Sequence, residues 1–95
     1  MSLHVVAHFH AAPGRGPELR ALLAPLVAPT STEDGCLVYR LHEDESDPDH
    51  FVFIEEWRDA ASLDLHMQTP HVAGMLADVP PLLAGPVAAY RLAEV

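Results

Sequence analysis

Residues 36–57, CLVYRLHEDESDPDHFVFIEEW, contain two strand-like segments separated by a run of acidic residues. In 36–43, one face carries Cys36, Val38, Arg40 and His42, and the other carries Leu37, Tyr39 and Leu41. In 50–57, one face carries Phe51, Phe53, Glu55 and Trp57. Alternation with a period of two predicts strands. The acidic run 43–49 lacks the glycine and the final glutamate of a calcium loop, so we expect a solvated hairpin loop.

On the N-terminal side of this hairpin, the sequence predicts one strand and one helix. Residues 3–10 alternate between two faces, of which one carries Leu3, Val5, Ala7 and Phe9 and the other carries His4, Val6, His8 and His10. Pro13-Gly14 ends this strand, and Pro17 begins a helix with an apolar stripe formed by Leu19, Leu22, Leu23, Leu26 and Val27. Pro25 removes a backbone donor, so we expect a kink or an early end there.

On the C-terminal side, the sequence predicts two short helices and a last strand. Asp59 is a good cap for a helix that carries Ala60, Leu63 and Met67 on one side. Thr69-Pro70 then begins a second helix, because threonine suits the N-cap and proline the first helical position. Pro80-Pro81 ends that helix, and Gly85-Pro86 leads into a strand over 87–92.

The predicted order of elements is β-α-β-β-α-β, within a single domain of residues 1–95. This is the ferredoxin-like split βαβ arrangement, an α+β fold whose antiparallel sheet has helices on one face only. Both strand faces carry bulky residues, namely Tyr39, Leu41, Phe51, Phe53 and Tyr90. We therefore expect the bare face to pack against a second copy, giving a homodimer and a dimeric α+β barrel.

The composition excludes several classes of partner. The formal net charge is −9, from fourteen acidic residues and five basic ones, all of them arginine. Such a chain is a poor partner for nucleic acid or an anionic membrane. The single cysteine, Cys36, excludes an intrachain disulfide and a cysteine-based zinc site. With no apolar stretch of transmembrane length and no signal-peptide pattern, we expect a cytoplasmic protein.

His66 and His71 are the strongest candidates for chemistry. The predicted helix junction holds both imidazoles, and imidazole suits proton transfer because it titrates near neutrality. The two are five residues apart with a proline between them and no third ligand nearby, so we expect no metal there. The alternative is two surface or capping histidines. Glu55, between Phe53 and Trp57, needs a partner when buried, and an imidazole or an arginine would serve.

Three histidines of the first strand, His4, His8 and His10, share one face. His8 and His10 have the spacing of half a metal site, but the sequence shows no supporting carboxylate. We therefore favour the interpretation that these side chains line a dimer seam or face water.

The chain resembles the antibiotic biosynthesis monooxygenase superfamily of small ferredoxin-like dimers. The resemblance rests on Pro13-Gly14 with the leucine helix, Glu33–Tyr39, Phe51–Trp57 and, most specifically, Leu63–His71 with its HxxTPH core. Members similar in that core include a quinol monooxygenase and an isomerase of a phosphorylated quorum-sensing sugar. Haem-degrading members have a tryptophan near position 66 and a histidine near Leu76, which this chain lacks.

The resemblance implies a pocket between sheet and helices that works without metal or flavin. It implies that His66 is the base or hydrogen-bond donor, His71 its partner, Trp57 a pocket wall and Glu55 an orienting carboxylate, with Tyr39 and His42 as further substrate-binding candidates. The leading function is then a cofactor-independent monooxygenase that oxidises a quinol-like or polyphenolic molecule with O2. The alternatives are an isomerase of a phosphorylated keto-sugar and a non-catalytic small-ligand-binding dimer.

Overall fold

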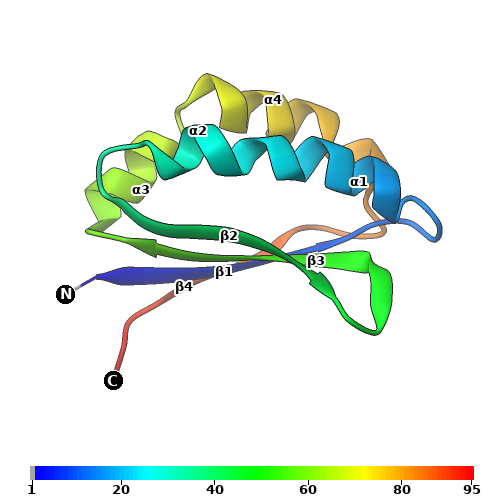
Figure 1. Cartoon of the computed structure of the whole chain (residues 1–95), viewed down its shortest axis with the longest axis horizontal. Coiled ribbons are helices and arrows are strands. Elements are labelled where there is room, and N and C mark those ends of the chain that lie inside the picture. Colours follow the sequence, from blue (N-terminus) through cyan, green and yellow to red (C-terminus); the bar gives the residue numbers. More distant parts are fainter. Residues whose placement is uncertain (1) are drawn as a thin grey trace.

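Four antiparallel strands form one sheet in the order β2-β3-β1-β4, and all the helices lie on one of its faces (Figure 1). The computed structural model describes residues 2–95. The elements are β1 (Leu3–His10), α1 (Gly16–Leu23), η1 (Ala24–Leu26), α2 (Val27–Ser31), β2 (Cys36–Asp44), β3 (Asp47–Trp57), α3 (Ala60–His66), α4 (Pro70–Asp78), η2 (Pro80–Leu82) and β4 (Ala88–Leu92). The expected ferredoxin-like α+β fold is confirmed.

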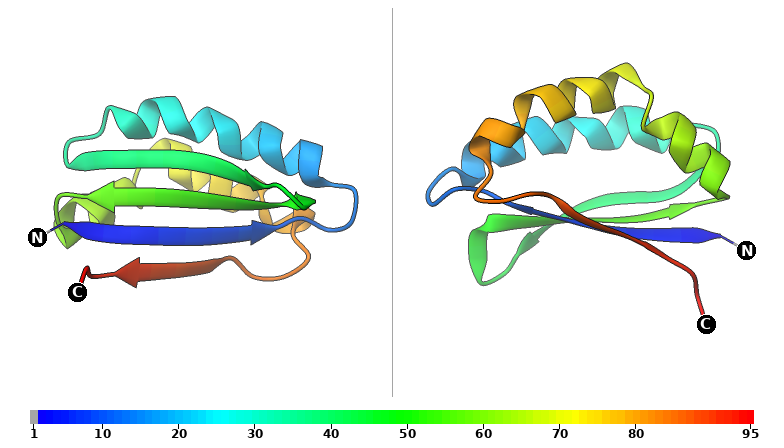
Figure 2. Two further views of the ribbon diagram at one scale, coloured as in Figure 1. Left: turned by 60° about the horizontal axis from the view of Figure 1, so that its bottom comes forward. Right: turned by 180° about the vertical axis from the view of Figure 1, so that it is seen from behind.

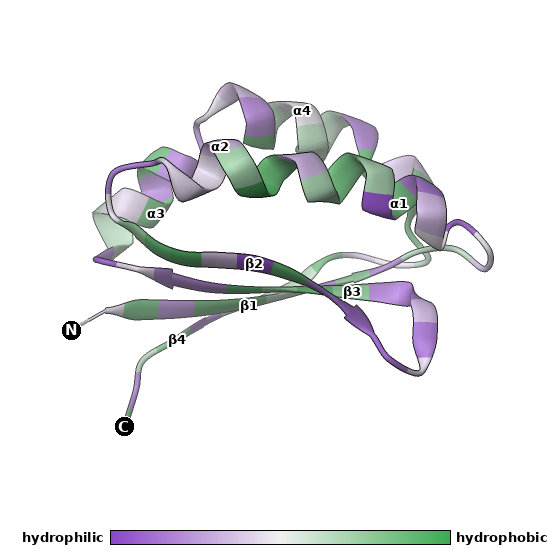
Figure 3. Ribbon diagram, viewed as in Figure 1, coloured by the Kyte–Doolittle hydropathy of each residue, from purple (hydrophilic) through white to green (hydrophobic). Residues whose placement is uncertain are grey.

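The β2–β3 hairpin is tighter than the sequence indicated. The expected acidic loop over 43–49 is wrong in extent, because β2 continues to Asp44, β3 begins at Asp47 and only Glu45–Ser46 form the turn. The Asp44 carboxylate accepts hydrogen bonds from the backbone N–H and the hydroxyl of Ser46, which closes this turn. The tip of the hairpin is strongly hydrophilic (Figure 3).

A bulge in β2 changes the face on which Cys36 lies. Cys36 pairs with Trp57 and Val38 with Glu56, so Leu37 is the extra residue between them. Cys36 therefore packs against the core, on the same side as Tyr39, while Leu37 is exposed. The strict alternation expected over 36–43 is wrong at this point, because a bulge shifts the pattern by one residue.

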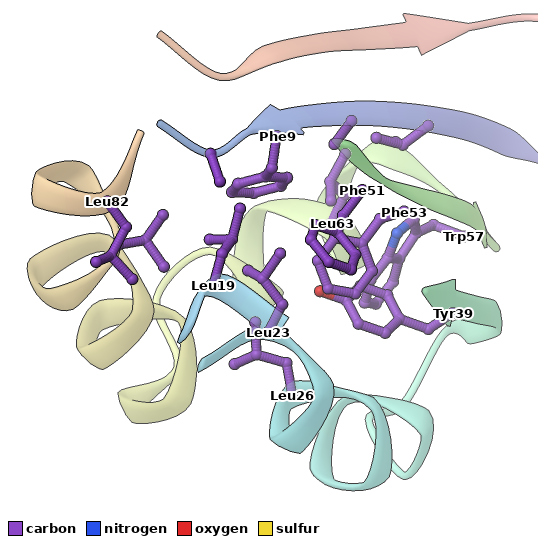
Figure 4. Close-up of a cluster of buried hydrophobic side chains, with 14 residues drawn as sticks. Phe9, Leu19, Leu23, Leu26, Tyr39, Phe51, Phe53, Trp57, Leu63 and Leu82 are labelled. Carbon is purple, nitrogen blue, oxygen red and sulfur yellow. The ribbon is translucent and has the colours of Figure 1, made fainter. Parts of the chain in front are cut away.

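The core lies between the sheet and the helices. Pro25 ends α1 as expected, and the chain continues as η1 and α2, farther than the apolar stripe reaches. The side chains that fill this layer are Phe9, Leu19, Leu23, Leu26, Phe51, Phe53, Trp57, Leu63 and Leu82 (Figure 4). Most of these side chains pack the sheet against α1 and η1. The candidate site lies beside this core, where α3 and α4 cross the sheet.

The junction between α3 and α4 has the predicted caps. The Asp59 carboxylate accepts a hydrogen bond from the Ser62 N–H at 2.8 Å, and Thr69 Oγ1 accepts one from the Val72 N–H at 3.4 Å. The Thr69 hydroxyl also donates to the carbonyl of His66 at 2.8 Å, tying the two helices together. His66 is therefore the last residue of α3, and His71 lies in the first turn of α4.

The opposite face of the sheet has no helix over it (Figure 2). We expected bulky residues on both faces of the sheet, and this is only partly correct. Four of the five bulky residues lie on the helix-covered face, namely Tyr39, Leu41, Phe51 and Phe53. The open face instead carries partly exposed residues, among them Val6, Ile54, Tyr90 and Leu92. Within residues 2–95, no helix has the length and apolar character needed to cross a bilayer.

Candidate active site

His66 and His71 meet at one carboxylate, that of Glu33. Nδ1 of His66 lies 3.0 Å from Oε2 of Glu33, and Nε2 of His71 lies 2.8 Å from the same oxygen. The side chains are 4% exposed for His66, 16% for Glu33 and 24% for His71. The alternative of two surface histidines is thus wrong for His66, which is buried, and the three groups form one hydrogen-bonded cluster.

Glu33 reaches the histidines because the chain turns sharply between α2 and β2. The Glu33 N–H donates to the Thr30 carbonyl, and the Cys36 N–H donates to the carbonyl of Glu33, so the turn holds Glu33 on both sides. Gly35 permits the turn with a φ of +86°, in the left-handed region. The α3–α4 junction then presents both rings to the carboxylate.

Glu33 determines which nitrogen of His66 is free. A carboxylate can only accept hydrogen bonds, so Nδ1 of His66 and Nε2 of His71 must carry the protons that point at it. In a neutral His66 ring, Nε2 then holds the lone pair, and among residues 2–95 it has no hydrogen-bond partner. This is the arrangement of a general base oriented by an acidic residue.

His66 forms part of the wall of a cavity of about 350 Å³ between the sheet, α3 and α4. The wall is mainly apolar and includes Phe9, Phe53, Leu63, Val72, Met75 and Val87. Its polar members are Tyr39, Glu55, His66 and Arg91. Small-molecule sites have this character, a concave apolar pocket with a few convergent polar groups.

Glu55 is buried, and its partner is Trp57 rather than an imidazole or an arginine. The Trp57 indole N–H donates to Oε1 of Glu55 at 2.9 Å. Burial raises the pKa of Glu55 to about 7, with a further rise from the charge of Glu33, while the Trp57 hydrogen bond acts in the opposite direction. The role of orienting His66 belongs to Glu33, and Glu55 is a separate carboxyl group that faces the cavity.

The remaining predicted residues separate into two groups. Trp57 and Tyr39 pack against His66, with ring centroids 4.7 and 5.4 Å from the imidazole. Only Tyr39 lines the cavity; Trp57 is fully buried and does not line it, so the prediction of Trp57 as a pocket wall is wrong. Burial, followed by the charge of Glu55, raises the pKa of Tyr39, so its hydroxyl keeps its proton. His42 is exposed and lies at a different hollow, with Arg20 and Arg40, so the structure does not bring it to His66.

Glu33 is the residue that sequence reasoning missed. It gives the two histidines a third potential metal ligand, since the nearest ligand atoms of all three lie within 4.8 Å of one another. The sequence argument against a metal at this junction assumed that no such residue existed. The signal was present in the Glu33-Asp34-Gly35 turn, but nothing local indicates that this carboxylate contacts residues 33 and 38 positions farther along.

The raised pKa of Glu55 predicts that the stability of the protein falls as the pH rises through the range in which this carboxyl ionises. The folded value, about 7, lies above the ordinary value of 4.5, so the folded state holds the proton where the unfolded state has lost it. At roughly 1.4 kcal/mol per unit, ionisation of the buried group costs up to about 3 kcal/mol by neutral pH.

Urea denaturation of the wild type and of Glu55→Gln at pH 4–8 measures this effect. The glutamine side chain keeps an acceptor for the Trp57 indole and has no charge. The free energy of unfolding of the wild type minus that of the variant should fall between pH 4.5 and 7 and then level off. A difference that stays constant with pH would contradict the proposed burial of an ionisable carboxyl.

Comparison with known proteins places this chain in a family. The sequence profile described as antibiotic biosynthesis monooxygenase matches residues 2–77. The uncharacterized protein sll1783 of Synechocystis is 36% identical over 92 residues, which are 95% of this chain and 63% of that protein. This chain thus spans less than two thirds of that relative's length.

Two solved structures are also similar. Rv0793 of Mycobacterium tuberculosis, which bears a provisional monooxygenase name, is 40% identical over 89 residues, 94% of this chain and 87% of that protein. Its structure gives a TM-score of 0.93 and covers 100% of this chain and 96% of its own. PA3566 of Pseudomonas aeruginosa gives a TM-score of 0.93 at 38% identity, with 99% and 94% covered.

Proposed function

Because the chain belongs to the antibiotic biosynthesis monooxygenase family, we propose that it oxidises a quinol-like or polyphenolic molecule with O2, without metal or flavin. The observation that carries the proposal is the arrangement of His66. Its Nδ1 is held by the Glu33 carboxylate, and the ring forms part of the wall of an apolar cavity. A base with one fixed free nitrogen beside such a cavity suits the removal of a proton from a hydroxyl group.

The first step is proton transfer from a substrate hydroxyl to Nε2 of His66. The Glu33 carboxylate stabilises the imidazolium that forms, since it accepts the opposite N–H at 3.0 Å. His71 holds the same carboxylate oxygen at 2.8 Å and so fixes its position. The transfer thus leaves an anionic substrate in the cavity and an imidazolium whose positive charge is paired with the Glu33 carboxylate.

The second step uses the electron-rich anion. One electron passes from the phenolate to O2, giving a semiquinone radical and superoxide, which combine to form a ring peroxide. His66 returns its proton to the peroxide, the O–O bond breaks, and water is lost as the ring carbon becomes a carbonyl. A hydroquinone and O2 thus give a hydroxyquinone and water, and the substrate supplies all four electrons.

One further polar group in the cavity wall supports this chemistry. Glu55, with a pKa of about 7, can donate or accept a proton at a second hydroxyl of the substrate. The Tyr39 hydroxyl lies against Thr30 of α2, so we assign Tyr39 to the wall through its ring and give its hydroxyl no part in the reaction. The apolar wall around them keeps out water that would intercept the radical pair.

A phosphorylated substrate fits the cavity less well. Of the residues that line it, Arg91 alone has a cationic side chain, and Arg91 is paired with Asp64 at 2.9 Å. The buried Glu55 carboxyl would repel a phosphate whenever it is ionised. These contacts favour a neutral aromatic substrate over the phosphorylated sugar of the isomerase alternative.

Oxygen uptake tests the proposal. Chelator-treated protein should consume O2 with at least one member of a panel of naphtho- and benzohydroquinones, above the rate of autoxidation. Under ¹⁸O2, one labelled oxygen atom should enter each product molecule. Stabilisation by these ligands without uptake would instead support a binding protein, and uptake that requires added iron or flavin would contradict the cofactor-free mechanism.

The open sheet face supports the proposal that the protein works as a homodimer. Ile54, Tyr90 and Leu92 on this face are 46, 55 and 45% exposed, which is unusual for side chains of this size on one surface. A two-fold partner would cover them and leave the cavity, on the other side of the sheet, accessible. Light scattering at micromolar concentration should then give the mass of two chains.

A further inference from the structure

A second histidine cluster lies on the open face of the sheet, opposite the cavity. It consists of His8 and His10 from β1 and His50 from β3. The register places His10 directly across from His50, and His8, two residues before His10, points to the same face. The nearest ligand atoms of the three rings lie within 4.8 Å of one another.

The contacts within this cluster place nitrogen atoms at near-coordinating distances. Nδ1 of His8 lies 3.0 Å from Nε2 of His50, and the His10 ring is parallel to the His50 ring at a centroid distance of 4.2 Å. Zinc–imidazole bonds of about 2.0–2.1 Å put neighbouring nitrogens of a tetrahedral site roughly 3.3 Å apart. His10 is exposed, so its ring can rotate toward the other two without disturbing the core.

Asp44 orients the His50 ring by binding the nitrogen that faces away from His8. Nδ1 of His50 donates to Oδ2 of Asp44 at 2.8 Å, so in the neutral ring Nε2 is the atom with the free lone pair. Metal-binding histidines commonly donate their second N–H to a carboxylate in this way.

We propose that His8, His10 and His50 bind a divalent transition metal ion, of which Zn²⁺ is the best fit. Three neutral imidazoles on adjacent strands supply three ligands from one chain. Because His8 contacts Tyr90 on the face proposed to pack against a second copy, the ion would lie at the dimer seam, with water as its remaining ligand. Imidazole nitrogen suits zinc, copper and nickel better than magnesium or calcium. The formal net charge of −9 favours the approach of a cation.

This site is independent of the active site. At the other cluster, Glu33 already accepts a hydrogen bond from each of its two histidines, and a metal would have to displace both protons. On the open face, His8 and His50 share one hydrogen bond, so a metal ion would have to displace only that single proton. His8 and His10 have the sequence spacing of half a metal site, which the sequence alone did not favour; the sheet register now adds His50 as a third ligand.

Zinc titration of the metal-free protein by calorimetry, with Co²⁺ absorption as a second readout, tests the proposal. We expect one ion per chain and the intense visible bands of a four-coordinate Co²⁺ site. His8→Ala, His10→Ala and His50→Ala should each lower the affinity by about 100-fold or more, and Asp44→Ala by roughly 10–100-fold.

Two matched controls locate the binding. His4→Ala removes a histidine from the same face of β1 but outside the cluster, and His71→Ala disrupts the other cluster, so both should bind Zn²⁺ as the wild type does. Circular dichroism of each variant checks that it folds, and exposed His10 offers the mildest change. Absence of binding at millimolar Zn²⁺, binding that survives all three substitutions, or binding lost in His71→Ala would each overturn the proposal.

Discussion

Replacing His66 with alanine should lower kcat for the quinol-dependent reaction by about 10²- to 10⁴-fold, the usual contribution of a general base. The ring is nearly inaccessible except to the cavity, and the Glu33 carboxylate fixes its tautomer. A loss of this size affects the chemical step, because the proton must leave before an electron can pass to O2. KM should change little, since the apolar wall provides most of the contact area.

Three further variants separate catalysis from folding and binding. His66→Gln fills nearly the same space, so it should fold normally and still lose activity. Glu33→Gln should give a smaller loss in kcat, because an amide orients the imidazole less well than a carboxylate. His42→Ala, on the exposed part of β2, should behave as the wild type. If His66→Ala raised KM and left kcat unchanged, His66 would be a binding residue.

Local sequence patterns were sufficient for most of the fold. Alternation over 3–10 and 50–57 and the caps at Asp59 and Thr69 depend on neighbouring residues only, and the structure has them as predicted. The exceptions depend on pairing between strands. The bulge at Leu37 and the short turn at Glu45–Ser46 arise from the register of β2 against β3, which no single segment specifies.

The site shows the same division between local and long-range information. Two of its groups were visible in the sequence because they are close along the chain: His66 and His71 at one junction, and Glu55 on the strand face of Trp57. The Trp57 indole was a local donor for Glu55 and could have been identified. The contact of Glu33 with His66 and His71 joins segments that are distant in the sequence, so only the folded chain reveals it. The same holds for the pairing of His50 with His10 in the second cluster.

Gly35→Ala should destabilise the protein by roughly 2–5 kcal/mol. Two costs add at this position. The φ of +86° is left-handed, and an alanine there costs about 1–2 kcal/mol. A Cβ atom would also overlap the Ser62 side chain, 2.1 Å from its Oγ and 2.5 Å from its Cβ, and overpacking of this kind costs roughly 1–3 kcal/mol or more.

Gly14→Ala is the matched control for the backbone cost. Gly14 has a φ of +81°, and a Cβ atom there would meet nothing within 4 Å, so its loss should be about 1–2 kcal/mol, that of backbone strain alone. Ser62→Gly in the Gly35→Ala background should recover the overlap cost and leave the strain. Urea denaturation of the four proteins measures both quantities. Equal losses of unfolding free energy for Gly14→Ala and Gly35→Ala would contradict this prediction. They would show that α3 shifts away from the new Cβ atom at no cost, and that the close packing of Gly35 against Ser62 is not needed for the turn.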